Sequence, residues 1–293
     1  MITAEQLEKV RRLRISSHQA ATSILAGEYR SVFRGHGIEF SEVREYQCGD
    51  DVRSIDWNVT ARTGRAHIKR YIEERQISVF ILADLSASQH IGSGDGKTGA
   101  VVRIAAILAA IAEAGGDRAG LVIFTDRIEC FLPPARGPQH LDRLIRELLY
   151  CNLKGTGTSI ATGLQSLKIM GDQRSIVFIV SDFQDDGFEH DMKLMAMHND
   201  IVAVRLADRV ELELPDAGCI RLQDSESGRA VMVDSSQPEV RRLYREKTEK
   251  RRSDLATFCR HNRVGLLDLS CDDDYIRELD VFFRKRMATA YFS

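Results

Sequence analysis

The stretch ISVFILAD, residues 77–84, decides the fold of this 293-residue chain. Its apolar residues follow one another without the polar alternation of a half-exposed strand, so it predicts a strand that is buried on both faces. SIVFIVSD at residues 175–182 repeats this pattern, and IVAVRLAD at residues 201–208 resembles it. Strands buried on both faces belong to parallel sheets that are covered by helices on either side.

Helical patterns alternate with these strands, which is typical of α/β proteins. The most apolar of them, residues 98–114, predicts a helix with almost no polar face. Shorter helices are expected at residues 139–151, 160–168 and 190–198, and a closing helix at 274–286. The predicted fold class is therefore α/β, with a doubly wound, Rossmann-like, mostly parallel sheet.

Two further stretches complete the predicted sheet. GLVIFTD at residues 120–126 and the following IECFLP are separated by a short turn, which suggests an antiparallel hairpin at the sheet edge. VGLLDLSC at residues 264–271 predicts the last strand, which closes the parallel part of the sheet. The order of the elements along the chain thus predicts one continuous sheet rather than two.

The chain divides into three parts by composition. Residues 1–27 predict an N-terminal helix, residues 28–76 a small β-rich subdomain dense in Arg and Asp, and residues 77–293 the sheet domain. Within the sheet domain, CIRLQD and RAVMVD are joined by a short polar turn and predict an inserted hairpin at about residues 216–235. A long charged helix, opened by Pro238 and ending near His261, follows this hairpin.

Composition and charge exclude several classes of protein. The 41 basic and 43 acidic residues give a formal net charge of -2, so we expect no nucleic-acid binding. The charged helix that follows Pro238 interleaves Glu with Arg and lacks stacking aromatics, which favours a solvated helix face. The apolar run 101–112 is interrupted by Arg103 and is too short to span a bilayer, so we expect a cytoplasmic protein without membrane insertion. The six cysteines form no C-x-x-C pair, and we expect free thiols.

Oxygen-bearing side chains follow the first buried strand. Asp84, Ser86 and Ser88 form a D-x-S-x-S turn at its carboxyl end, where open α/β sheets bind their ligands. Thr158, in the glycine-rich stretch KGTGTS, and Asp182, at the end of SIVFIVSD, supply two more oxygens on separate loops. Because Mg²⁺ takes oxygen ligands and retains waters, these residues predict one magnesium site built from three loops. The alternative is that Ser86 and Ser88 only cap the turn while Asp84 bonds backbone amides.

This set of residues resembles the metal-ion-dependent adhesion site of the von Willebrand factor type A fold. That site has D-x-S-x-S, then a Thr after Gly, then an Asp after a later strand, and all five positions are filled here. The resemblance implies that a divalent cation captures a carboxylate of a partner protein. The sequence departs from the pattern at Phe183, where many members have Gly, and this puts the shape of the loop in question.

The sequence also contains stretches that resemble motifs of enzymes, but each of these motifs is incomplete. GSGDGKT at residues 92–98 resembles a phosphate-binding loop, but Ile91 stands where its first glycine belongs, and the loop begins well after the strand. GTSIA around Ser159 approaches a nucleophile elbow without the second glycine and without a strand directly before it. The eight histidines show no zinc-binding spacing. We expect no catalytic residues.

The segment that precedes the sheet, residues 33–76, is the most distinctive part of the chain. It alternates arginines with acidic residues, which indicates a lattice of salt bridges or, as the alternative, a surface for a partner. Trp57, the only tryptophan, is expected to be buried as the anchor of this small subdomain. A core aromatic of this kind would stabilise the fold by about 3–5 kcal/mol.

The same segment resembles the bacterial domain-of-unknown-function family numbered 58. The shared motifs are RGHGIEF, GDDVRSIDW and ART, and the resemblance covers nearly the whole chain. Members of that family commonly accompany MoxR-type AAA+ ATPases, so the resemblance implies such an ATPase as the partner.

The leading functional hypothesis is therefore a non-enzymatic protein-interaction module that binds a partner carboxylate through Mg²⁺. One alternative is a nucleotide-binding enzyme that uses Lys97, Thr98 and Asp182 in the manner of a P-loop. The other alternative is a structural scaffold whose metal site stays empty.

Overall fold

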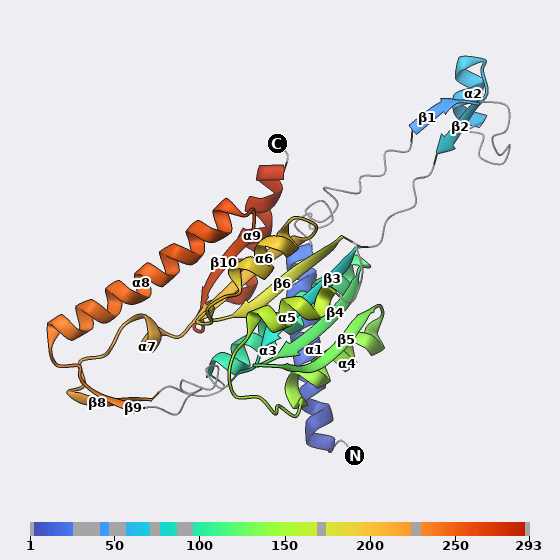
Figure 1. Cartoon of the computed structure of the whole chain (residues 1–293). Coiled ribbons are helices and arrows are strands. Elements are labelled where there is room, and N and C mark those ends of the chain that lie inside the picture. The colour runs from blue at the N-terminus through green and yellow to red at the C-terminus, as the bar shows by residue number, and fades with distance from the viewer. Residues whose placement is uncertain are drawn as a thin grey trace.

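The computed structural model of the protein describes residues 3–25, 42–46, 57–70, 77–86, 96–168, 174–223 and 230–290. Figure 1 shows a central twisted sheet with helices on both of its faces. The chain is thus a mixed α/β protein, as the alternation of strand and helix patterns predicts.

Six strands form the central sheet, in the order β10-β7-β6-β3-β4-β5. All neighbouring pairs are parallel except β4 and β5, which form the predicted antiparallel hairpin at one edge. The predicted positions of the central strand, its neighbour and the closing strand are confirmed, because β3 pairs with β6 and β10 lies at the opposite edge. The strands are β3 (Ser78–Asp84), β4 (Arg118–Phe124), β5 (Ile128–Ala135), β6 (Ser175–Ser181), β7 (Asp200–Ala207) and β10 (Gly265–Ser270).

Helices cover both faces of this sheet because its central strands bury side chains on both sides. Ile81 and Ala83 of β3 belong to one hydrophobic cluster, and Phe80 and Leu82 belong to a second one on the other face. The first cluster contains residues of α1 (Ala4–Leu25), α3 (Gly96–Gly115), α4 (Pro138–Tyr150) and α9 (Tyr275–Ala290). The second contains residues of α5 (Ile160–Leu167), α6 (Glu189–Ala196) and α8 (Pro238–His261).

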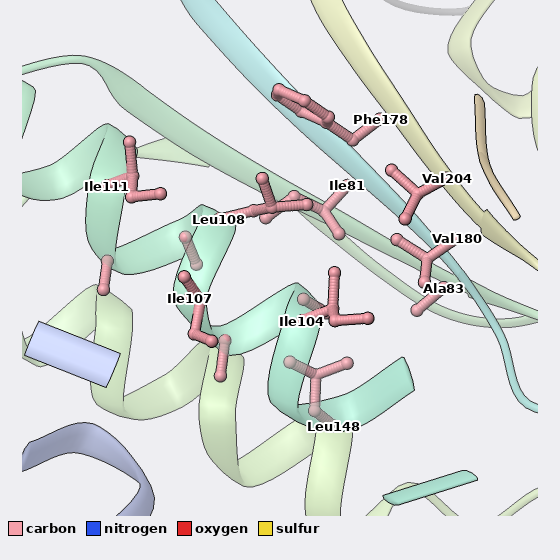
Figure 2. Packing of buried hydrophobic residues seen from close by; sticks show 14 of the residues in the cluster. Ile81, Ala83, Ile104, Ile107, Leu108, Ile111, Leu148, Phe178, Val180 and Val204 are labelled. Atoms are coloured by element: carbon pink, nitrogen blue, oxygen red, sulfur yellow. The ribbon is translucent and has the colours of Figure 1, made fainter. Parts of the chain in front are cut away.

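Helix α3 forms the centre of the first cluster. Figure 2 shows Ile104 and Leu108 of α3 facing Ile81 of β3 and Val180 of β6. On its other side α3 packs against α1 and α4, so nearly every face of the helix is covered. This packing explains why its sequence has almost no polar face.

The length of α3 corrects one expectation. The apolar run was expected to be too short for a bilayer, but the helix that contains it has 20 residues and includes an apolar window of 18 residues. Within the described parts of the chain it is the one helix that could cross a membrane by length and composition. However, 67% of that window is buried inside the protein, so its apolar character is accounted for by the core.

Two small sheets lie outside the central one. The predicted inserted hairpin is confirmed as β8 (Cys219–Gln223) and β9 (Ala230–Asp234), which pair antiparallel with each other and form their own sheet. A short helix, α7 (Arg209–Leu212), lies between β7 and this hairpin. Before the central sheet, β1 (Glu42–Glu45) pairs with β2 (His67–Arg70), and α2 (Trp57–Thr63) packs on β2.

The prediction that Trp57 is buried is wrong. Trp57 is the first residue of α2, and its side chain is 69% exposed. The unit of β1, α2 and β2 stands away from the central sheet in Figure 1, so the described part of that sheet does not cover this unit. Most of the Arg-rich lattice proposed for residues 33–76 lies outside the described residues, but Arg65 and Glu45 do pair at 2.8 Å, with both side chains exposed.

Replacing Trp57 should therefore cost little stability. We expect Trp57→Ala to change the free energy of unfolding by no more than about 0.5 kcal/mol, because exposed side chains without special contacts contribute this little. Urea denaturation followed by circular dichroism measures this, since the variant has no tryptophan fluorescence. A loss of several kcal/mol would mean that another surface covers the ring in solution.

Candidate metal site at the carboxyl edge of the sheet

The point where the chain reverses its direction across the sheet lies between β3 and β6. From β3 the chain moves to β4 and β5 on one side, and it then returns to β6 and β7 on the other side. In open α/β sheets such a point, at the carboxyl ends of the strands, is where ligands bind. Asp84 is the last residue of β3, and Asp182 directly follows β6, so the structure brings these two predicted site residues to this point.

Asp84 is fully buried at this edge. Its Oδ1 accepts a hydrogen bond from the Ser86 backbone N–H at 3.0 Å, and its Oδ2 accepts one from the Ser181 hydroxyl at 2.6 Å. The Ser86 hydroxyl, also fully buried, bonds to the same carboxylate. Burial, followed by the negative charge of Asp182, raises the pKa of Asp84 to about 6 in spite of these bonds. The negative charge of Asp182 therefore disfavours the charged form of Asp84.

Asp182 is bound by Lys97, which the magnesium hypothesis did not assign to the site and which the P-loop alternative assigned to phosphates. Lys97 lies in the first turn of α3, and its side chain is fully buried. Its Nζ donates to Asp182 Oδ2 at 2.7 Å and to Glu211 Oε1 of α7 at 2.6 Å. Burial opposes the charged form, but the two carboxylates outweigh it and raise the pKa of Lys97. Lys97 is thus an ammonium ion held between two carboxylates.

Further hydrogen bonds close this network. The Gln184 backbone N–H donates to Asp182 Oδ1 at 3.1 Å, and the Gln184 side chain donates to Glu211 Oε1 at 3.3 Å. The Asp208 backbone N–H donates to Glu211 Oε2 at 3.1 Å. The start of α3 is thereby tied to the loops that follow β6 and β7, and the ammonium has a fixed position at the sheet edge.

The loop that carries Thr158 is fastened to the same edge by Glu129 of β5. Glu129 Oε1 accepts hydrogen bonds from the backbone N–H groups of Lys154 and Gly155, at 3.0 and 2.6 Å, and from the Thr125 hydroxyl at 2.8 Å. Gly155 has to be glycine, because a Cβ there would lie 2.1 Å from Thr125 Oγ1. Thr158 itself is half-buried in this loop.

Two residues at the start of α5 hold the end of this loop. The Ser159 backbone N–H donates to the Thr125 carbonyl oxygen at 2.9 Å, and the Ile160 N–H donates to Asp185 Oδ2 at 2.8 Å. Thr158 is therefore placed between the loop after β4 and the loop after β6. The Ser159 hydroxyl caps α5 by accepting from the Thr162 N–H at 3.2 Å, which gives this side chain a structural role.

The structure thus brings four of the five predicted residues to one edge of the sheet: Asp84, Ser86, Thr158 and Asp182. The fifth, Ser88, lies outside the described residues, as do residues 92–95 of the GSGDGKT stretch. Lys97, which the P-loop alternative assigns to phosphates, is instead bonded to Asp182 and Glu211.

The donor types gathered at this edge fit a hard divalent cation. Carboxylate and hydroxyl oxygens are the ligands that Mg²⁺ takes in proteins, and the mutual repulsion of two buried carboxylates is relieved by a cation near them. Within the described ranges, no group of three or more His, Cys, Asp or Glu side chains is arranged to hold a metal. A metal at this edge would therefore depend on hydroxyls and waters besides the two carboxylates.

Phe183, the departure from the adhesion-site pattern, has a backbone conformation that favours glycine. Its φ is +55°, in the left-handed region where a Cβ is strained. The side chain compensates by burial, because the ring is only 9% exposed and meets the ring of Phe188 edge-on, with 5.7 Å between the centroids. The loop thus keeps a glycine-like backbone at this position while the aromatic ring packs into the second hydrophobic cluster.

Two substitutions at Phe183 separate these effects. We expect Phe183→Ala to lower the free energy of unfolding by about 3–5 kcal/mol, because it removes a buried ring and keeps the strained Cβ. Phe183→Gly should be more stable than Phe183→Ala by about 1 kcal/mol, because glycine adopts this φ without strain. Urea denaturation of both variants measures the difference, and an alanine variant as stable as the glycine variant would contradict the left-handed backbone.

Comparisons with known proteins identify relatives but no activity. A family model described as "Protein of unknown function DUF58" matches residues 42–254. An uncharacterized protein of Mycobacterium tuberculosis is 30% identical over 281 residues, which are 94% of this chain and 88% of that protein. An uncharacterized protein of Mycobacterium avium is 25% identical over 159 residues, which are 52% of this chain and 92% of that protein.

Two solved structures that resemble this chain share little sequence identity with it. The conserved hypothetical protein BatB from Bacteroides thetaiotaomicron is 14% identical, with a TM-score of 0.46 over 74% of this chain and all of that one. The pilus adhesin SpaC from Lactobacillus rhamnosus GG is 11% identical, with a TM-score of 0.45 over 75% of this chain and 30% of that one. Neither similarity assigns a function to the site.

Proposed function

Because this chain belongs to the DUF58 family, whose description names no activity, we propose its function from its own site: a non-enzymatic protein-interaction module. In this proposal the sheet domain is of the von Willebrand factor type A kind and acts in the cytoplasm. Asp84, Ser86, Ser88, Thr158 and Asp182 are the residues that would hold one Mg²⁺, directly or through water. The metal supplies a position at which a carboxylate of a partner protein binds.

The observation that carries this proposal is the pair of buried carboxylates where the chain reverses its direction across the sheet. Burying Asp84 at 0% exposure beside Asp182 costs stability, as the raised pKa of Asp84 indicates. Groups with perturbed pKa values cluster at functional sites, where a bound ligand or cation can offset such repulsion. The hydroxyl of Ser86 at the same point completes an oxygen-rich donor set that suits Mg²⁺.

The partner in this proposal is a MoxR-type AAA+ ATPase, which the family resemblance implies. An Asp or Glu side chain of that ATPase would approach the metal from outside the sheet edge. This chain's own residues would orient the metal, and the loop held by Glu129 would keep Thr158 in position.

A specific observation favours a second candidate. Lys97 already holds a positive charge at 2.7 Å from Asp182, so the site could work as a metal-free scaffold in which the ammonium replaces the metal. The two candidates differ in whether partner binding depends on Mg²⁺.

Binding of the purified ATPase to the Asp84→Asn variant tests the first candidate. Asparagine keeps the size of the side chain and one hydrogen-bond acceptor but removes the charge that a cation needs. In Mg²⁺ we expect the variant to bind the ATPase at least about tenfold more weakly than the wild type, equivalent to a loss of 1.4 kcal/mol or more. Isothermal titration with the ATPase of the same organism measures this.

The control is Asp280→Asn, because the ion pair of Asp280 lies within α9. Asp84→Asn is a more decisive test than a chelator, because a chelator also removes Mg²⁺ from the ATPase. Unchanged binding by Asp84→Asn would reject metal-dependent docking, and the Arg-rich segment 33–76 would become the preferred docking surface.

A further inference from the structure

Lys97 introduces a positive charge into the very site proposed for a divalent cation. It is among the largest of the fully buried side chains that the structure describes, and its ammonium touches a predicted metal ligand, Asp182. The inference drawn from it rests on the proposed function, because it concerns how strongly that site holds Mg²⁺.

The position of Lys97 is unfavourable in two respects that its partners have to offset. It lies in the first turn of α3, where the positive end of the helix dipole repels a cation. Its ammonium is also withdrawn from water, which is costly for any charged group. The carboxylates of Asp182 and Glu211 compensate for this, with oxygens at 2.7 and 2.6 Å from Lys97 Nζ. The side chain of Asp182 is almost as deeply buried as that of Lys97. A lysine held in this way is a fixed part of the electrostatics of the site.

We propose that Lys97 is an internal counter-cation that lowers the affinity of the site for Mg²⁺, and that Glu211 moderates this effect. The ammonium competes for Asp182 because it binds the Oδ2 of that carboxylate directly. Glu211 accepts a second hydrogen bond from the same ammonium, so part of the positive charge is neutralised by Glu211 and not by Asp182. The balance of these two residues sets the affinity for the metal.

The same charge has the opposite effect on a partner carboxylate. An ammonium near the site opposes a divalent cation but attracts an incoming anion, since both interactions follow the sign of the charges. The metal is therefore bound weakly alone and more tightly when the partner's carboxylate is present. Such reciprocal coupling makes the site respond to metal and partner together rather than to metal alone.

Three variants of the full chain separate the roles of the two residues. Glu211→Gln keeps the lysine but removes the carboxylate that offsets it, and the double variant Lys97→Met/Glu211→Gln removes both charges. These two proteins differ only at position 97, and the double variant loses one charge of each sign, which limits the cost to folding. Lys168→Met is the control, because Lys168 forms a comparable bond of 2.8 Å with Asp191, between α5 and α6.

Isothermal titration with Mg²⁺ alone gives the readout. We expect Glu211→Gln to bind Mg²⁺ several-fold more weakly than the wild type, and the double variant to bind it about tenfold or more tightly than Glu211→Gln. Lys168→Met should match the wild type. If Lys97 had only a structural role, Glu211→Gln and the double variant would both weaken the binding of Mg²⁺ or would both leave it unchanged.

The outcomes separate this inference from the proposed function. If the wild type binds Mg²⁺ and the double variant binds no more tightly than Glu211→Gln, the inference is overturned while the metal site stands. If the double variant binds Mg²⁺ and the wild type does not, the inference holds. The metal-dependent function is then wrong, and the metal-free scaffold is supported instead. If none of the proteins binds Mg²⁺, both are overturned.

Discussion

Replacing Lys97 with methionine should lower the free energy of unfolding by about 3–5 kcal/mol when a chelator is present, because it leaves buried carboxylates without their cation. The side chains of Asp182 and Glu211 are only 2% and 15% exposed, so water cannot take the place of the ammonium. Methionine fills a similar volume, and the loss therefore reports on charge rather than on packing. Urea denaturation at neutral pH measures it.

The matched control is again Lys168→Met. Lys168 bonds to Asp191 at a similar distance, but its side chain is 49% exposed, and exposed pairs contribute no more than about 1 kcal/mol. Restoring neutrality in the triple variant Lys97→Met/Asp182→Asn/Glu211→Gln should recover much of the loss, since no uncompensated charge remains. If Lys97→Met were as stable as the control, the buried ion pair would not exist in solution.

Replacing Asp84 with asparagine should have the opposite effect in the absence of metal. The pKa of Asp84 is raised from 3.8 to about 6, chiefly by burial and then by Asp182. A shift of this size disfavours the folded state by about 3 kcal/mol at neutral pH. We expect Asp84→Asn to be more stable than the wild type by about 1–3 kcal/mol at pH 7.5 in chelator, because asparagine has no charge to bury.

The pH dependence of this difference has a defined sign. A carboxyl group whose pKa is higher in the folded state than in the unfolded state destabilises the fold as the pH rises from about 4 to about 6. The advantage of Asp84→Asn should therefore be absent below about pH 3, be small near pH 4, grow up to about pH 6 and stay constant above about pH 7. Urea denaturation of both proteins at several pH values tests this. A variant less stable than the wild type at pH 7.5 in chelator would contradict the repulsion between the two carboxylates.

Much of the fold is predictable from the sequence because its strands are buried on both faces. An uninterrupted apolar run such as residues 79–83, within a stretch of strand length, is typical of the interior of a helix-covered sheet, and on this basis β3 and β6 were predicted as central neighbours. The hairpins were predictable from local signals, since β4 and β5 are separated by only three residues. The packing of α1 on α3 was not predictable, because the sequence pattern of a helix does not indicate which other helix packs against it.

Trp57 shows a limit of reasoning from one residue type. A single tryptophan in a polar segment indicates a side chain that could be buried, but it does not indicate a surface that covers it. The described part of its subdomain consists of two four-residue strands and one short helix, which offer too little apolar surface to bury the ring.

The candidate site was predictable in its carboxylates and hydroxyls, whereas the sequence placed Lys97 beside Asp182 only in the P-loop alternative, as a ligand of phosphate and not as a partner of the two carboxylates. Asp84 and Asp182 follow buried strands, and parallel strands bring their carboxyl ends to one edge. Lys97 is separated from Asp182 by 85 residues and from Glu211 by 114, so no local pattern links them. One signal was available: a lysine at the start of an otherwise apolar helix has to find a buried partner or reach solvent.

Titration of the wild-type protein and of Asp84→Asn with Mg²⁺ tests the central claim most directly, because it needs no partner. We predict saturable binding of one Mg²⁺ by the wild type at millimolar concentrations, with a matching rise in its thermal unfolding temperature, since a ligand that binds only the folded state stabilises it. Asp84→Asn should show neither effect, although it is the more stable protein in chelator. Equal binding by the two proteins, or no binding by the wild type, would contradict a metal site at Asp84.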